Sequence, residues 1–275
     1  IAINMHLELL NFFILLLITG IFSGILAGLL GVGGGIIIVP VTYYILKSFG
    51  VSSDVIMHIS VASSLGVIIL TSISSIFSHF KLKNIEIEIV KNWFFGTILG
   101  SVFGAFLSSA ISGDSLVIIF IMLASIISFK MLIGNNFVYS QQMPSSYIFN
   151  SFISFIIGTL SVSIGIGGGS FTVPTLTGFG KNIHKAVGTS ATIGLLISFP
   201  GFLIYTITGY NIDGIPNYSL GYVNIIIVLS ISITSIFTAP IGAKLSTKFN
   251  NKALKKIFAV FLLMTCISLF INHFF

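Results

Sequence analysis

The sequence predicts an all-α polytopic membrane protein with two inverted-topology repeats, each a glycine-tipped helix hairpin plus three transmembrane helices. Three observations predict this fold: the composition, a series of apolar segments, and a glycine motif that occurs twice. Of the 275 residues, 55% are hydrophobic and only 7% are charged, whereas a soluble domain has roughly a quarter charged residues. The composition excludes a water-soluble globule. The chain also lacks a basic cluster on a polar domain, so nucleic-acid binding is not expected.

Apolar stretches between polar residues divide the chain into ten predicted helices. They lie near 9–30, 36–47, 55–79, 89–110, 115–134, 145–164, 170–180, 185–208, 218–243 and 253–273. The second and seventh are too short to span a bilayer easily, and each follows a cluster of glycines that a continuous helix tolerates poorly. We therefore expect hairpins over 9–47 and 145–180, within repeats 1–136 and 137–275. The lengths leave open whether the short segments are re-entrant or fully spanning.

The lysines predict the orientation, because Lys and Arg in short loops stay in the cytoplasm. If both hairpins enter and leave on the same side, all lysines except Lys47 fall on one side of the membrane. This side holds Lys81, Lys83, Lys91, Lys130, Lys181, Lys185, Lys244, Lys248, Lys252, Lys255 and Lys256. We expect it to be cytoplasmic, with both termini outside.

The glycine motif relates the two halves of the chain. The first copy runs from Gly24 to Pro40 and the second from Gly158 to Pro174, with five glycines and the Val-Pro end in step at an offset of 134 residues. Farther on, the stretch from His58 matches the stretch from His184. With the lysine orientation, the first hairpin enters from outside and the second from the cytoplasm, as in many secondary transporters. Two inverted halves can exchange conformations, which predicts alternating access.

Helix packing is the alternative explanation for the glycines. Small residues four apart let membrane helices approach closely, and this spacing fits Gly24 with Gly28 and Gly100 with Gly104. Packing does not explain three consecutive glycines followed by a proline five residues on, in both halves.

The glycine tracts predict an anion site. Unwound backbone at membrane depth must be buried in protein or line a cavity, so we expect the two tips to meet near the midplane. Bare amides favour an anion, as does the positive end of a helix that begins just beyond, at Pro40 or Pro174, which we regard as structural residues. The predicted substrate-binding glycines are Gly31, Gly33, Gly34, Gly35, Gly165, Gly167, Gly168 and Gly169.

Hydroxyls on the helices after the hairpins are further candidates, because they can donate to an oxyanion. The predicted contacts are Ser63, Ser64, Thr189 and Ser190. Such hydroxyls also commonly bond the carbonyl one turn back in their own helix. The chain has no arginine, so a guanidinium clamp is impossible and amides and hydroxyls would build the site.

Coupling is left open between a proton and sodium. His58 and His184 are candidates for proton coupling, since imidazole titrates near neutral pH, and helix capping or an interfacial position is the alternative. No Asp or Glu lies deep in a predicted segment, so a carboxylate relay is absent. We find no metal or cofactor motif and no enzyme signature, and we predict that the protein is not an enzyme.

The residues resemble the sulfite exporter TauE/SafE family of membrane transporters. The resemblance rests on Gly28-Leu-Leu-Gly31-Val-Gly-Gly-Gly35 with Val39-Pro40, on Ile164-Gly-Ile-Gly-Gly-Gly169 with Val173-Pro174, on Ala186-Val-Gly-Thr189-Ser190, and on Ala239-Pro-Ile-Gly242. It covers nearly the whole chain, and it departs from the family pattern at Ala62-Ser63, where Gly-Thr is more usual. It implies a multi-pass permease of the bacterial-type inner membrane that moves sulfur-containing or organic anions such as sulfite or sulfonates.

Two classes of function therefore follow from the sequence. We expect a secondary transporter that moves a small anion across the lipid bilayer by alternating access. The alternative is a non-transporting membrane protein that assembles or anchors a partner, in which the glycine tips serve only for packing.

Overall fold

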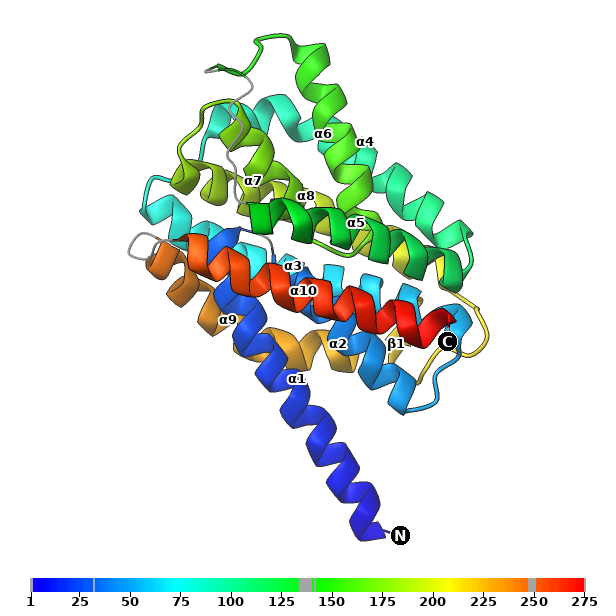
Figure 1. Ribbon diagram of the computed structural model, residues 1–275. Helices are drawn as coiled ribbons and strands as arrows, with labels where there is room; N and C mark the ends of the chain where they lie inside the picture. The colour runs from blue at the N-terminus through cyan, green and yellow to red at the C-terminus, as the bar shows by residue number, and fades with distance from the viewer. Residues whose placement is uncertain (1, 32, 134–139, 141, 247–250, 275) are drawn as a thin grey trace.

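The structure, a computed structural model, describes residues 2–274 except 32, 134–139, 141 and 247–250. The described residues form ten helices and one pair of short strands (Figure 1). The elements are α1 (Ala2–Leu30), α2 (Gly35–Ser48), α3 (Ser53–Lys81), α4 (Ile87–Ala110), α5 (Gly113–Ile133), α6 (Tyr147–Ser163), α7 (Gly169–Gly178), α8 (Ile183–Thr208), β1 (Ser219–Leu220), β2 (Val223–Asn224), α9 (Ile225–Ser246) and α10 (Asn251–Phe274). The predicted helical membrane fold is confirmed. Lys248 and the expected boundary between residues 136 and 137 lie outside the described residues.

Six helices of the described chain are long and apolar enough to cross a bilayer. They are α1 over Leu10–Leu30, α3, α4, α5, α8 and α9. The segments predicted to be short are short, since α2 has 14 residues and α7 has 10. Each of them pairs with the helix before it, α1 or α6, as the predicted hairpins require.

The ninth predicted segment was wrong at its start. It was expected over 218–243, but α9 begins at Ile225, and a two-stranded antiparallel hairpin of β1 and β2 precedes it. Tyr218 and Gly221 have φ values of 62° and 56°, which a helix does not allow. The Asn224 side chain then caps α9 by accepting the N–H of Ile227 at 3.1 Å. The predicted segment was too long because it included the apolar residues of the hairpin.

Close glycine contacts join α1 to α9 and α4 to α6 (Figure 1). A Cβ atom on Gly24 would collide with Ser235 and Thr238, and one on Gly100 would collide with the backbone of Phe155. The packing explanation for these glycines is confirmed.

Helices at equivalent positions of the two sequence repeats, α3 with α8 and α5 with α10, run in opposite directions. The first turns of α8 contact the residues after the end of α3, where Thr189 accepts the N–H of Glu86. α5 and α10 are also antiparallel, since Ser128 bonds the carbonyl of Ala259 at one end and Asp114 lies 3.8 Å from His273 at the other. A two-fold axis between the halves would produce these directions.

The bundle therefore has two distinct ends. One end holds the α3–α4 connection (Figure 1, left). Lys81, Lys83 and Glu86 lie at or in this connection, and Lys181 and Lys185 contact Glu86, so we call it the lysine-rich end. The opposite end holds the α2–α3, α4–α5 and α8–α9 connections (Figure 1, right).

Candidate functional site

Both short helices begin at a glycine with left-handed backbone. Gly34 precedes α2 with φ 80°, and Gly168 precedes α7 with φ 76°. An L-residue with a side chain is strained in this conformation. Neither helix has a side-chain cap, so the first N–H groups are left for another partner.

The short helices begin within one residue of the predicted segment starts at 36 and 170, and the expectation that they begin only at Pro40 and Pro174 was wrong. Both prolines are the sixth residue of their helices, because α2 begins at Gly35 and α7 at Gly169. Proline has no N–H for the carbonyl four residues earlier. The helices extend back to the glycines because left-handed backbone at Gly34 and Gly168 turns the chain directly into the first helical turn.

The two glycine tips contact each other, as predicted. A Cβ atom on Gly35 would collide with the carbonyl of Gly165, and one on Gly33 would lie 3.2 Å from the Cα of Gly167. The tips also pack against the middle of the two central helices, with Gly165 beside Val61 of α3 and Gly167 beside Gly194 of α8. Backbones can approach this closely only where side chains are absent.

Two equivalent serines bond the tip of the other half. The Ser64 hydroxyl on α3 donates to the carbonyl of Gly165 at 2.8 Å, and the Ser190 hydroxyl on α8 donates to the carbonyl of Gly31 at 3.1 Å. Both serines are completely buried. In this structure they position the tips, and their contact with substrate stays a prediction.

Ser63 and Thr189 form a second equivalent pair. Ser63 accepts the N–H of Asn224 at 3.0 Å, and Thr189 accepts the N–H of Glu86 at 2.9 Å. Each donor is the residue just before a helix, α9 or α4. These bonds hold the two ends of the bundle against the central helices, and a role for either hydroxyl in binding substrate stays a prediction.

The second tip carries hydrogen-bond donors without a partner. In the described part of the chain, no acceptor is present for the N–H groups of Gly167, Gly169 and Ser170. The side-chain hydroxyls of Ser170 and Thr172 are buried and also without a partner. This tip therefore concentrates five donor groups at the positive end of α7.

Sequence reasoning missed Ser170 and Thr172. The signal was present in the repeat, where the first copy has Ile36 and Ile38 at the matching positions. An apolar pair in one copy and a hydroxyl pair in the other distinguishes the two tips chemically.

The two predicted histidines have different surroundings. The ring nitrogens of His58 each lie 3.2 Å from a backbone carbonyl, that of Asp54 or of Ser108, and the ring stacks on Tyr222. His184 lies in the first turn of α8, and its Nδ1 is buried with no partner. His58 links elements at the end opposite the lysines, and the structure does not bring the two histidines together.

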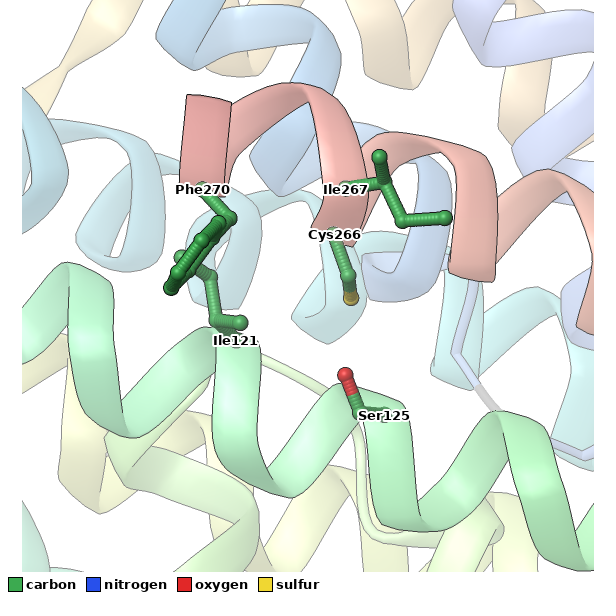
Figure 2. Close-up of a pocket in the computed structure, with 5 residues that line it drawn as sticks. All are labelled: Ile121, Ser125, Cys266, Ile267 and Phe270. Atoms are coloured by element: carbon green, nitrogen blue, oxygen red, sulfur yellow. The ribbon is translucent and has the colours of Figure 1, made fainter. Parts of the chain in front are cut away.

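A cavity of about 200 Å³ lies between α5 and α10, away from the tips (Figure 2). Its lining is Ile121, Ser125, Cys266, Ile267 and Phe270. Nearly all of this lining is apolar, and the flanking surfaces of both helices expose large hydrophobic side chains. The cavity offers an anion few hydrogen-bond donors, so the tips are the better candidate site.

Comparison with known proteins places the chain in a family. The model of the family described as Sulfite exporter TauE/SafE matches residues 16–269. The chain belongs to the sulfite exporter TauE/SafE family. As a member of this family it is a membrane transporter, which implies a small-molecule substrate and a lipid bilayer.

Curated relatives of this TauE/SafE chain carry the same broad description. A probable membrane transporter protein of Haemophilus influenzae is 35% identical over 95% of this chain and 99% of its own length. Another of Methanocaldococcus jannaschii is 31% identical over 92% and 94%, and one of Bacillus subtilis is 26% identical over 92% and 95%. No solved structure gives a significant match.

Proposed function

We propose that the protein is a secondary transporter for a small anion, which binds at the tip that begins α7. The observation that carries the proposal is the set of unpartnered donors at this tip, the N–H groups of Gly167, Gly169 and Ser170 with the hydroxyls of Ser170 and Thr172. Buried donors without acceptors are costly, and a bound anion would supply the acceptors.

The chemistry of the tip favours an anion over a cation. The unpartnered hydroxyls of Ser170 and Thr172 can donate hydrogen bonds, and with the free N–H groups they lie at the positive end of a helix. No charged side chain occurs in the tip, so binding depends on neutral dipoles. Such a site suits an anion that must be released again.

Alternating access is supported by matched contacts at the two ends. At the lysine-rich end, Thr189 accepts the N–H of Glu86, and at the opposite end Ser63 accepts the N–H of Asn224. Both hydrogen bonds are formed in this structure, so both ends are closed. Opening one while the other stays closed would expose the tips to one side of the membrane at a time.

The substrate class follows from the family and the tip together. The family description names sulfite, and an oxyanion of sulfur presents several acceptor oxygens to amides and hydroxyls. We therefore propose sulfite, a sulfonate or a related sulfur-containing or organic anion as the substrate. The transporter would lie in the inner membrane of a bacterial-type cell with its lysine-rich end in the cytoplasm.

Ligand binding tests the proposal directly. The purified protein would be melted with sulfite, thiosulfate, methanesulfonate or acetate, and then compared with the Ser170→Ala, Thr172→Val double variant. A matched control is Thr175→Val on the same helix, because its hydroxyl already bonds the carbonyl of Phe171 at 2.7 Å.

We expect at least one anion to raise the melting temperature of the parent and of Thr175→Val but not of the double variant. The same anion should move across proteoliposomes that contain the parent. Equal stabilisation of the double variant would reject the site. Neither stabilisation nor flux with any of the four anions would reject the proposed function and favour the partner-anchoring alternative.

A further inference from the structure

Three buried polar atoms without a partner lie at the lysine-rich end. They are Nδ1 of His79, the side-chain nitrogen of Asn84, and Nδ1 of His184. His79 is in the last turn of α3, Asn84 is in the α3–α4 connection, and His184 is in the first turn of α8. The ring of His79 is completely buried.

Backbone contacts place these residues in one cluster. The N–H of Asn84 bonds the carbonyl of His79 at 3.0 Å. Asn84 packs against Gly188, one helical turn beyond His184. Residues four apart share one face of a helix, so His184 lies on the face of α8 that Asn84 contacts at Gly188.

The partner of the other ring nitrogen fixes the proton on His79. Its Nε2 lies 3.0 Å from the carbonyl of Gly28 on α1. A carbonyl only accepts, so Nε2 carries the hydrogen and donates it. In the neutral ring, Nδ1 therefore holds a lone pair that no group satisfies, and this nitrogen is where a proton would bind.

The surrounding charges do not compensate a proton at this position in the closed structure. The α3–α4 region contributes Lys81, Lys83, Glu86, Glu88 and Lys91, the α7–α8 connection and the start of α8 contribute Lys181, His184 and Lys185, and the end of α9 contributes Lys244. α1 has no charged residue near Gly28.

Two acids, Glu86 and Glu88, are among these groups. Glu88 is exposed in the first turn of α4, and Glu86 is already paired. Its carboxylate lies 2.6 Å from Nζ of Lys185 and 3.9 Å from Nζ of Lys181. The hydrogen bond from Lys185 keeps the pKa of Glu86 below its ordinary value. The carboxylate therefore remains charged and bound to lysine at neutral pH.

We propose that His79, with His184 beside it, forms a proton-binding site whose occupancy favours opening of the lysine-rich end. In the closed structure a proton on Nδ1 would be a buried charge with no acceptor. When Asn84 and Glu86 move away from α8, water can reach the ring and stabilise the imidazolium. By linkage, the conformation that binds the proton more tightly is the one that the proton favours.

The same region leads from this site to the glycine tips. Ser75 lies one turn from His79 and Thr192 one turn from Gly188, and the hydroxyls of both are buried without a partner. Gly194 follows on α8 and contacts the carbonyl of Gly167 at the second tip. Opening would hydrate these polar groups, so proton binding at His79 would be linked to access to the anion site. This consequence rests on the proposed function.

Cysteine accessibility tests the proton site without any anion. Ser75→Cys in a Cys266→Ala background places a thiol one turn inside His79, and Lys83→Cys in the same background reports the intrinsic pH dependence of the reagent on an exposed residue. The rate of maleimide labelling of Ser75→Cys, divided by that of Lys83→Cys, would be measured between pH 8 and 5.5 in detergent or nanodiscs.

We expect this ratio to rise as the pH falls, by up to about tenfold for a tenfold difference in proton affinity between the open and closed ends. His79→Gln should abolish the rise, since glutamine can still donate to Gly28 but does not titrate. His273→Gln, a histidine at the opposite end beside Asp114, should leave it intact. His184→Gln should reduce it, and this variant keeps the test available if His79→Gln does not fold.

A ratio that does not change with pH in the parent would overturn the proposal. So would a rise that persists in both His79→Gln and His184→Gln, or one that disappears in His273→Gln. Because no anion is present, these outcomes are independent of whether the anion assays succeed.

Discussion

At the scale of single residues, each half of the protein holds the glycine tip of the other half. Ser64 of the first half bonds Gly165 of the second, and Ser190 of the second bonds Gly31 of the first. The Ser190 hydroxyl has two acceptors, the carbonyl of Gly31 and, at 2.7 Å, the carbonyl of Val187. The Ser64 hydroxyl donates to the carbonyl of Gly165. A tip can leave its position only if the serine of the other half releases it, which makes the two halves interdependent.

Removal of these hydroxyls should destabilise the protein. Ser64→Ala leaves a buried carbonyl without its donor, so we expect the free energy of unfolding to fall by about 1 to 3 kcal/mol, with a smaller loss for Ser190→Ala. Thermal unfolding of the purified protein would measure both. Ser109→Ala is the control, because this hydroxyl is exposed and bonds within its own helix. Melting temperatures for Ser64→Ala and Ser190→Ala that match the control would contradict the positioning role.

Residue chemistry also explains what the sequence could predict of the site. The glycine tips were predictable because three consecutive glycines and a proline recur in both halves. The role of His79 was not, because its unpaired nitrogen depends on a contact with Gly28, 51 residues away. Likewise Ser64 and Ser190 were found as candidates from their matching positions, but only packing shows that each one reaches a glycine of the opposite half.

At the scale of helices, the same glycine arrangement joins α1 to α9 and α4 to α6. Thr159 on α6 donates to the carbonyl of Gly100 at 3.0 Å, and Thr234 on α9 donates to the carbonyl of Leu17 at 2.8 Å. Each pair runs parallel, since Gly20, Gly24 and Gly28 meet successively later residues of α9. These pairs attach the first helix of each hairpin to a spanning helix of the other half.

A methyl group should disturb this packing measurably. In Gly100→Ala the new Cβ would collide with the carbonyl of Phe155, so α4 and α6 must separate, at a cost of about 1 to 3 kcal/mol. The neighbouring Leu99→Ala is the control, because Leu99 is 60% exposed on the outer face of the bundle. We expect a lower melting temperature for Gly100→Ala alone, and equal losses in the two variants would argue against the close contact.

Helix positions were predicted well where long apolar runs end at polar residues. α3, α4, α5 and α8 begin and end within a few residues of the expected positions. The start of α9 was not predicted, because an apolar β-hairpin and a helix have similar composition. The starts of α2 and α7 depend on left-handed backbone at Gly34 and Gly168, which tertiary contacts select from the conformations that glycine allows.

At the scale of the whole molecule, matched contacts close both ends around the tips. The lysine-rich end has the Glu86 contacts with Lys185 and Thr189, and the opposite end has Asn224 on Ser63 and Tyr222 on His58. The closing elements differ in size. Five residues connect α3 to α4, whereas the connection from α8 to α9 includes the β-hairpin. The energies of opening the two ends therefore need not be equal, and proton binding at His79 would act on one of them.

The two ends should face opposite sides of the membrane, with the lysines in the cytoplasm. Lys83 lies in the α3–α4 connection and Asp213 in the α8–α9 connection, and both are exposed. In a Cys266→Ala background, an impermeant maleimide added to intact cells should label Asp213→Cys at once and Lys83→Cys only after permeabilisation. The unsubstituted background should remain unlabelled. Labelling of Lys83→Cys alone in intact cells would reverse the orientation. Labelling of both from one side would contradict the spanning arrangement itself, because a bundle with its hairpins inserted from opposite faces must keep these two connections on different sides of the bilayer.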